Sequence, residues 1–352
     1  MGKHSNNPLR PGATCMQLLA AAILGAVLSA PAPLLAQSAA SADAWKATVA
    51  AAQKEQKVVL YSAAANPLLT RLKADFDRAN PGVVLEISRF STGELLTKLA
   101  QERETGADGA DVMIATDIAW AEDRLRDGGV KPPVGPSAQA WPARYMLRGA
   151  VPVLALEPVV MAYNTNLVKT PINSYQDLLK PELKGRIGIL DLTATSIIAF
   201  YDWLEKNEGA DYLARLAAQS PRIYTSSPAG GQSVGSGEIP VINFINPANI
   251  VPLIKQGAPV KEVYTKPRFG FRFIGVALGW SKRPNASQVL MDYVMSARGQ
   301  TVWSGNGESA SALRNIPGAL DADSINPYDP APYTPEVVKS YTAKWNTLFK
   351  GR

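Results

Sequence analysis

Short apolar runs alternate with amphipathic stretches in the first third of the chain. Residues 57–61 (KVVLY), 83–88 (VVLEIS) and 111–115 (DVMIA) are rich in aliphatic and β-branched side chains, which is typical of buried strands. Between these runs, apolar residues recur at every third or fourth position, as on one face of a helix. The order strand, helix, strand, helix, strand predicts an α/β fold with a parallel sheet, in which ligand sites lie at the carboxyl ends of the strands.

The helix before the third strand has clear ends in the sequence. Ser91 and Glu94 have the S-x-x-E spacing of a capping box, which predicts a helix that begins at Thr92, and Gly106 is placed to end it. The first amides of such a helix lack intrahelical partners and favour an anionic group. Gly93 would let that group approach the backbone closely. From this stretch alone, a well-capped helix with a purely structural role is the favoured interpretation.

The rest of the chain repeats the alternation after one break. Proline, glycine and scattered aromatics over residues 131–158 predict irregular surface structure, and the strand at 159–163 then takes the chain into a second domain. The long apolar run at 271–280 can return the chain to the first domain. Further strands are predicted at 186–190, 222–225, 238–245 and 260–263, and further helices at 41–56, 175–179, 193–204, 211–218, 246–257, 284–298 and 335–348.

The first 36 residues have the pattern of a secretory signal peptide. Lys3 and Arg10 precede an apolar run at 18–30, and small residues follow near position 36. That run of about 13 residues is too short to span a bilayer. We therefore expect cleavage of this segment and export of the protein to the periplasm.

Cleavage would remove Cys15 and His4, which are the only cysteine and the only histidine of the chain. The mature protein would then have no disulfide, no thiol or histidine nucleophile, and no zinc site built on Cys or His. No cofactor and no metal site are predicted. Hydrolases that use a carboxylate pair or a Ser-Lys pair stay open.

Charge and length narrow the class of protein. The 36 basic residues are dispersed among 30 acidic ones without a basic run, so nucleic acid is not expected as a partner. The small positive excess suits an acidic small ligand. A mature chain of about 315 residues fits two domains, and we expect a monomer.

Several motifs, taken in their order along the chain, resemble those of the extracellular solute-binding proteins of ABC importers. The group in question contains binders of ferric ion, thiamine, phosphonates and sugar phosphates. The motifs are KVVLYSA, STGELLTKLAQE followed by ADVMIATD, VVMAYNTNLV, SYQDLLKPELKGRIGI, GEIPVINF, KQGAPV and MDYVMSARGQ. The resemblance implies a two-lobed periplasmic-binding-protein fold, with a hinge between lobes that close on a small-molecule ligand. It also implies an ABC permease in the inner membrane as partner.

On this basis the chain divides into four parts. Residues 1–36 are the signal peptide, 37–160 the first part of lobe 1, 161–270 lobe 2, and 271–352 the return to lobe 1 with the C-terminal helices. The function expected is capture of a phosphate ester, phosphonate or carboxylate for delivery to the permease, without chemical change. A carboxylate-dependent secreted hydrolase and a sensor subunit with the same binding chemistry are the alternatives.

Ferric ion is a less favoured ligand. Ferric binders of this group carry two adjacent tyrosines where this chain has Asn243 and Phe244, and often a histidine near the position of Ala64 and Ala65. A hard cation needs anionic oxygen ligands, which these positions lack. An iron chelate stays open as an alternative.

Hydroxyl-bearing helix starts carry the predicted binding site. Ser91 with Thr92, the segment 193–196, and Ser227 would face one cleft if the lobes close, although each could serve only as a helix cap. Arg89 could bind an anion through two hydrogen bonds, and Asp117 could meet a ligand amine or cap its own helix. Tyr61, Trp120, Phe244 and Trp280 are candidate cleft aromatics. The predicted ligand-binding residues are Ser62, Arg89, Ser91, Thr92, Gly93, Asp117, Thr193, Thr195, Ser196, Ser227, Asn243 and Asn246.

Overall fold

The structure is a computed structural model that describes residues 32–351. The chain divides into two units, Met1–Ala40 and Ser41–Arg352, and the second unit holds both sheets. Most of the predicted signal peptide lies outside the described residues. Within 32–351, no helix is both long and apolar enough to cross a membrane.

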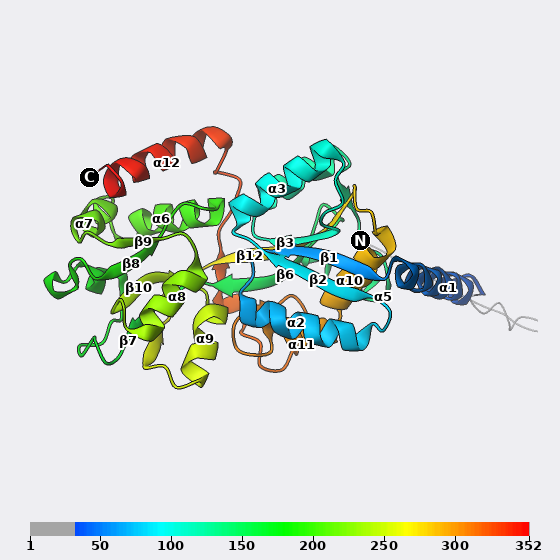
Figure 1. Cartoon of the computed structure of the whole chain (residues 1–352), viewed down its shortest axis with the longest axis horizontal. Coiled ribbons are helices and arrows are strands. Elements are labelled where there is room, and N and C mark those ends of the chain that lie inside the picture. The colour runs from blue at the N-terminus through cyan, green and yellow to red at the C-terminus, as the bar shows by residue number, and fades with distance from the viewer. Residues whose placement is uncertain (1–31, 352) are drawn as a thin grey trace, which may run out of the picture. The chain divides into compact units, whose positions relative to one another are not determined.

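The first lobe is organised around a nine-stranded sheet whose central path runs β13-β6-β12-β3-β1-β2 (Figure 1). Strands β2 and β3 pair in parallel with β1, while β12 runs antiparallel to both β3 and β6. The strands are β1 (Lys57–Ser62), β2 (Val84–Arg89), β3 (Val112–Ala115), β4 (Val130–Lys131), β5 (Met146–Leu147), β6 (Val151–Pro158), β12 (Phe269–Leu278), β13 (Ala310–Ser311) and β14 (Asn326–Pro327).

The second lobe contains a five-stranded sheet in the order β11-β7-β10-β8-β9. Strands β10, β8 and β9 are parallel to one another, and β7 runs antiparallel to both β10 and β11. The strands are β7 (Val160–Asn164), β8 (Ile187–Leu190), β9 (Arg222–Tyr224), β10 (Val241–Ile245) and β11 (Val260–Val263). Both sheets therefore have a parallel core, as the alternation in the sequence predicts, and the α/β two-lobed fold is confirmed.

Two segments carry the chain between the sheets. Strand β6 of the first lobe leads through Val159 into β7 of the second, and β11 leads back into β12. The prediction of irregular structure over 131–158 is wrong for its last third, because all eight residues of β6 are buried in the sheet. A strand covered on both faces has no polar alternation, and Pro152 and Pro158 led to its interpretation as loop.

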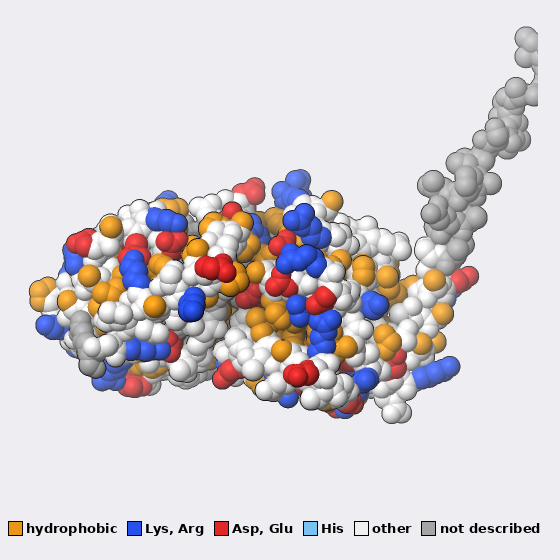
Figure 2. Space-filling view, turned by 90° about the horizontal axis from the view of Figure 1, so that it is seen from above, with side chains coloured by type: hydrophobic (Ala, Val, Ile, Leu, Met, Phe, Trp, Pro, Cys, Tyr) orange, Lys and Arg blue, Asp and Glu red, His pale blue; other side chains and the backbone are white. Residues whose placement is uncertain are grey.

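Helices cover the sheets on both sides (Figure 1), and Figure 2 shows basic and acidic side chains interspersed over the visible face. Those of the first lobe are α1 (Ala32–Glu55), α2 (Asn66–Ala79), α3 (Thr92–Thr105), α4 (Ile118–Arg126), α5 (Pro136–Gln139), α10 (Pro284–Met295) and α11 (Ala297–Ser304). Those of the second lobe are α6 (Thr195–Glu208), α7 (Tyr212–Ala218), α8 (Ser227–Ser236), α9 (Pro247–Lys255) and α12 (Pro335–Phe349). Short 3₁₀ turns lie at Ala143–Tyr145, Tyr175–Leu179, Pro181–Leu183 and Ala322–Ser324.

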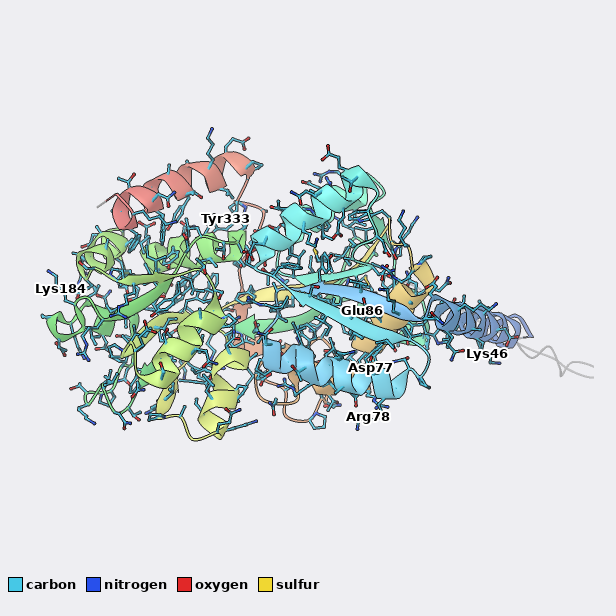
Figure 3. The ribbon with its side chains drawn as sticks, viewed as in Figure 1. Lys46, Asp77, Arg78, Glu86, Lys184 and Tyr333 are labelled. Carbon is cyan, nitrogen blue, oxygen red and sulfur yellow. The ribbon has the colours of Figure 1, made fainter. Side chains whose placement is uncertain are left out.

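The C-terminal helix α12 packs on the second lobe although the strand before it, β14, pairs with β12 of the first. Trp345 is fully buried against Tyr201 of α6. Tyr333, at the start of this segment, donates a hydrogen bond to Asp202 at 2.7 Å (Figure 3). The segment after β14 is thus a third connection between the lobes. The boundaries 37–160, 161–270 and 271–352 stay a prediction.

Candidate ligand-binding cleft

A cavity lies where the strand ends of the two lobes meet. Its volume is about 500 Å³, including the open solvent at its mouth. In the first lobe the ends of β1, β2 and β3 share one edge, because Ser62 pairs in register with Arg89 and with Ile114. The lining residues are Ala63, Arg89, Ser91, Thr92, Thr116, Leu190, Thr193, Ala194, Ser196, Ile197, Thr225, Ser226, Ser227, Phe244, Asn246, Phe271 and Phe273.

Arg89 supplies positive charge to this cavity. It is the last residue of β2, and its Nε atom is buried without a hydrogen-bond partner among the described residues. None of the ion pairs within 32–351 includes its guanidinium. Burial lowers the pKa of Arg89, against the attraction of Glu94, but an arginine side chain keeps its charge in a protein. The result is a half-buried cation that lines a cleft with unused hydrogen-bonding capacity.

The helix start beside Arg89 is completed by its own side chains. The Ser91 hydroxyl accepts from the Glu94 amide, and the Glu94 carboxylate accepts from the Ser91 amide at 2.9 Å, so the predicted capping box and the start at Thr92 are confirmed. The Gly93 amide donates to the Thr193 carbonyl of the second lobe at 3.2 Å. A methyl group on Gly93 would lie 3.0 Å from that oxygen. In this arrangement Gly93 contacts the other lobe.

The three helix starts of the second lobe that lie at the cavity lack such caps. Helix α6 has Ala194 at its N-cap, and neither Ser226 at the start of α8 nor Asn246 at the start of α9 caps its helix through its side chain. The sequence analysis placed the α8 cap at Ser227, but the structure places it one residue earlier. Ser227 instead accepts hydrogen bonds from the Asn246 amide at 3.2 Å and from the Asn249 side chain at 3.0 Å. Three helix starts therefore lack a capping side chain, and α6 offers more free N–H groups than α8 and α9, because Pro228 and Pro247 have no N–H.

Hydroxyl groups from the two lobes meet at the edge of the cleft. Thr116 lies 3.4 Å from the hydroxyl of Thr92 and 3.4 Å from that of Ser196. Thr195 donates to the Asp117 carboxylate at 3.5 Å, and that carboxylate also accepts from the Trp120 amide to cap α4. Burial raises the pKa of Asp117. The structure thus gives Asp117 a capping role and a contact between lobes.

Asn246 connects the cleft to a buried carboxyl group. Its Nδ2 donates to Glu157 Oε2 at 2.6 Å. A residue at the start of α9 is thus hydrogen-bonded to the end of β6 in the other lobe. Burial, with Glu308 nearby, raises the pKa of Glu157 to about 8. The side chain that could have capped α9 is therefore held by Glu157.

Three phenylalanines form the apolar part of the lining. Phe271 and Phe273 come from β12, and Phe244 comes from β10. The rings of Phe244 and Phe271 are parallel within 6° at 6.3 Å, and Phe273 meets Phe271 edge-on at 5.8 Å. Of the predicted cleft aromatics only Phe244 lines the cavity. Trp120 and Trp280 contact each other, with ring centroids 6.5 Å apart, and Tyr61 donates to Glu102.

The structure brings seven of the twelve predicted residues to the cavity. They are Arg89, Ser91, Thr92, Thr193, Ser196, Ser227 and Asn246. Gly93, Asp117 and Thr195 lie at contacts between the lobes. Ser62 is fully buried and donates to the Ile114 carbonyl, while Asn243 is fully buried and lies outside the lining.

Sequence analysis missed five polar or aromatic lining residues: Thr116, Thr225, Ser226, Phe271 and Phe273. Thr116 and Thr225 each follow directly on a strand of a parallel set, β3 and β9, and that position could have identified them. Across the described part of the chain, no three His, Cys, Asp or Glu side chains group closely enough to hold a metal ion.

The comparisons with known proteins agree with this architecture. The profile of a family described as bacterial extracellular solute-binding protein matches residues 58–307. A search of curated protein sequences gave no match. The substrate-binding protein of an ABC transporter from Agrobacterium tumefaciens is 19% identical, with a TM-score of 0.75 over 84% of this chain and 94% of that one.

Two further solved structures show the same fold. AfuA from Actinobacillus pleuropneumoniae, solved with fructose-6-phosphate bound, is 20% identical, with a TM-score of 0.69 over 84% of this chain and 98% of that one. Iron-bound HitA from Pseudomonas aeruginosa is 16% identical, with a TM-score of 0.61 over the same shares. At these identities the likeness concerns the fold alone. The class of ligand has to be inferred from the geometry of the cleft.

Proposed function

Because the chain belongs to the family of bacterial extracellular solute-binding proteins, we propose that it captures a small anionic solute in the cleft between its lobes. The family serves transport, and its members act outside the cytoplasmic membrane, in the periplasm, as partners of ABC permeases. The solute we propose is a phosphate ester, a phosphonate or a carboxylate. It would be released to the permease unchanged, after synthesis of the protein with a cleavable signal peptide.

The observation that carries this proposal is the unpaired charge of Arg89. A half-buried guanidinium without a carboxylate partner is costly, and a ligand anion at the cleft would supply the missing partner through charge-assisted hydrogen bonds. The helix starts of α6, α8 and α9 face the same cavity with backbone donors. Positive charge from one lobe and amides from the other both favour an anion.

Closure of the lobes follows from the same contacts. The Gly93 to Thr193 hydrogen bond and the contact between the Thr116 and Ser196 hydroxyls join the two lobes at the cleft. A ligand enters only after these contacts separate, and it shifts the equilibrium toward the closed state only if it touches both lobes. An anion between Arg89 and the start of α6 would do so.

Titration calorimetry of the mature protein tests this proposal. Inorganic phosphate, a sugar phosphate, an arylphosphonate and a carboxylate form the anionic set, and a polyamine, thiamine and ferric citrate form the comparison set. We expect binding of at least one simple anion, and loss of at least about 30-fold in its affinity in Arg89→Met, because truncating one member of a desolvated charge pair costs about 2 kcal/mol or more.

The matched control is Arg78→Met. Arg78 lies on α2 of the same lobe (Figure 3), is largely exposed and pairs with Asp75 at 3.5 Å, so its loss should leave the affinity unchanged. Binding of the polyamine but of no anion would overturn the proposal. An equal loss in the two variants would show that Arg89 acts only through the overall charge of the protein. Binding of ferric citrate alone would point to an iron chelate.

A further inference from the structure

We propose that the cleft selects anions with an apolar, flat body and no cationic group, such as an aryl carboxylate, arylphosphonate or aryl phosphate ester. This inference rests on the anion binding proposed above and narrows its ligand class. It concerns the part of the cavity that lies away from Arg89, which the charge argument does not address.

The apolar side of the cavity is built from both lobes. Phe271 and Phe273 are two positions apart on β12, so their side chains project from the same face of that strand. Phe244 of β10 adds a third ring, with its plane parallel to that of Phe271. Leu190 and Ile197 extend the same surface. Aromatic faces set beside one another offer a flat ligand ring stacking and edge contacts on several sides.

These rings are nearly inaccessible when the lobes are closed. Phe244, Phe271 and Phe273 are 3%, 4% and 3% exposed. Opening of the lobes would bring this surface toward solvent, and a ligand with an apolar body would cover it again on closure. Burial of apolar area of both partners is favourable at about 25 cal/mol per Å². The free energy of closure would then depend on the apolar body of the ligand as well as on its anionic head.

No residue that lines the cavity is acidic. The carboxyl groups just outside the lining already have partners: Asp117 accepts from Trp120 and Thr195, Glu157 accepts from Asn246, and Glu94 accepts from Ser91. An ammonium group on the ligand would therefore find no countercharge, and it would lie in the same cavity as the Arg89 guanidinium. Desolvation without a partner and repulsion between like charges both disfavour it. The cavity thus discriminates against zwitterionic and cationic solutes.

The volume limits the size of the body. The space of about 500 Å³ includes open solvent at the mouth, so the part that the lining residues enclose is smaller. We therefore expect a body no larger than a single ring. The polar groups lie at the helix starts, near the head, and the phenylalanine rings offer no hydrogen bond to further polar substituents.

A series of three phosphonates tests the inference, because the phosphonate head stays constant while the body changes, and a sugar phosphate adds a polyhydroxylated body on a phosphate ester head. Calorimetry would compare phenylphosphonate, methylphosphonate and 2-aminoethylphosphonate, with glucose 6-phosphate as a polyhydroxylated body, at one pH and ionic strength. We expect phenylphosphonate to bind at least tenfold more tightly than each of the others. Equal affinity for the phenyl and methyl compounds, or tighter binding of the amino or sugar compound, would overturn the inference while anion binding stands. Failure of all four, of inorganic phosphate and of the carboxylate would overturn both proposals.

Substitutions connect the preference to the rings. Phe273→Leu should lower the ratio of phenylphosphonate to methylphosphonate affinity at least threefold, because a flat face is lost while the head site is intact. Phe76→Leu is the matched control: Phe76 of α2 is fully buried against Tyr293, away from the cleft, and should leave the ratio unchanged. If Phe273→Leu does not fold, Phe244→Leu replaces it. An unchanged ratio in the cleft variant would overturn the role of the rings.

Discussion

The helix starts of the two lobes differ in how their backbone donors are satisfied. In the first lobe, α3 is capped by Ser91 and Glu94, and α4 by Asp117. In the second lobe, α6, α8 and α9 begin without a side-chain cap, although α8 and α9 have serine and asparagine at the N-cap. Helix α2 of the first lobe also begins without a side-chain cap, at Ala65, so the contrast is between α3 and α4 on one side and α6, α8 and α9 on the other. The first lobe supplies charge through Arg89. The second lobe leaves backbone N–H groups without a side-chain acceptor, and a bound anion would accept hydrogen bonds from them.

This difference divides recognition between side chain and backbone. Arg89 gives attraction that depends on the number of charges on the ligand, whereas helix starts give directed donors and a partial positive charge that falls off within one turn. The closed contacts place the two kinds of group on opposite walls of one cavity. The comparison would fail if substitutions at the uncapped helix starts of the second lobe left ligand affinity unchanged. It would also fail if removal of a cap in the first lobe lowered that affinity.

The largest expected effect concerns the reason why α9 begins without a side-chain cap. Asn246 does not cap α9 because Glu157 holds its amide group. The raised pKa of Glu157, about 8, means that the folded state keeps this proton while the unfolded chain loses it above its ordinary pKa. The unfolded state then binds fewer protons, so stability falls as pH rises between about 5 and 8. In Glu157→Gln this loss should disappear, and the variant should gain about 1.4 kcal/mol per pH unit relative to the parent protein over that window.

Denaturant unfolding at pH 5, 6, 7 and 8 measures the effect. The matched control is Glu86→Gln, because Glu86 is an exposed carboxylate on β2 that pairs with Lys57 at 3.0 Å (Figure 3). Its stability should follow that of the parent protein at every pH. If the free energy of unfolding changed with pH in the same way in Glu157→Gln and in the parent, the account would be contradicted. The uncapped start of α9 would then be unrelated to the protonation of Glu157.

The next effect concerns the contact of the capped start of α3 with the second lobe. In the open state, Gly93→Ala should raise the free energy of unfolding of the first lobe by about 0.5 to 1 kcal/mol, since alanine favours the helix. The added methyl would meet the Thr193 carbonyl at 3.0 Å, so closure should weaken and anion affinity should fall about tenfold, or about 1.4 kcal/mol. Calorimetry and thermal unfolding measure these opposite changes.

Gly235→Ala serves as control for Gly93→Ala, since Gly235 lies in α8 of the second lobe and a methyl there meets only the end of a leucine side chain at 3.2 Å. It should keep the parent affinity. Unchanged affinity in Gly93→Ala would mean that the lobes do not approach at this point in the bound state.

Local signals in the sequence predicted the parts of the fold that depend on neighbouring residues. The capping box correctly predicted the start of α3. That helix ends at Gly106 as predicted, and Gly106 has a positive φ of 66°. Strand β11 has the predicted limits, 260–263, and α12 begins at Pro335 as predicted. Strand β12 was predicted to return to the first domain, and it pairs there with β3 and β6.

The errors arise where the answer depends on distant parts of the chain. Strand β6 is buried on both faces by elements that the sequence of 151–158 does not reveal. Asn243 and Phe244 are adjacent on β10, so they point to opposite faces, and only the fold shows that Phe244 faces the cavity. The site prediction identified the helix starts and Arg89 but missed Phe271 and Phe273, because their face of β12 becomes a cavity wall only when both lobes are present.

The smallest expected effect compares one cap from each lobe directly. Ser91→Ala removes the hydroxyl that caps α3 and should lower the free energy of unfolding by about 1 kcal/mol. Ser226→Ala removes an N-cap hydroxyl that makes no capping bond, and stability should change by less than about 0.5 kcal/mol. Affinity for the anion should respond in the opposite order: both serines line the cavity, but the Ser91 hydroxyl is engaged with Glu94, whereas the Ser226 hydroxyl makes no capping bond. Urea unfolding and calorimetry on the two variants provide both numbers. Equal losses of stability would show that α8 is capped in solution, and the contrast between the capped start of α3 and the uncapped start of α8 would then be wrong.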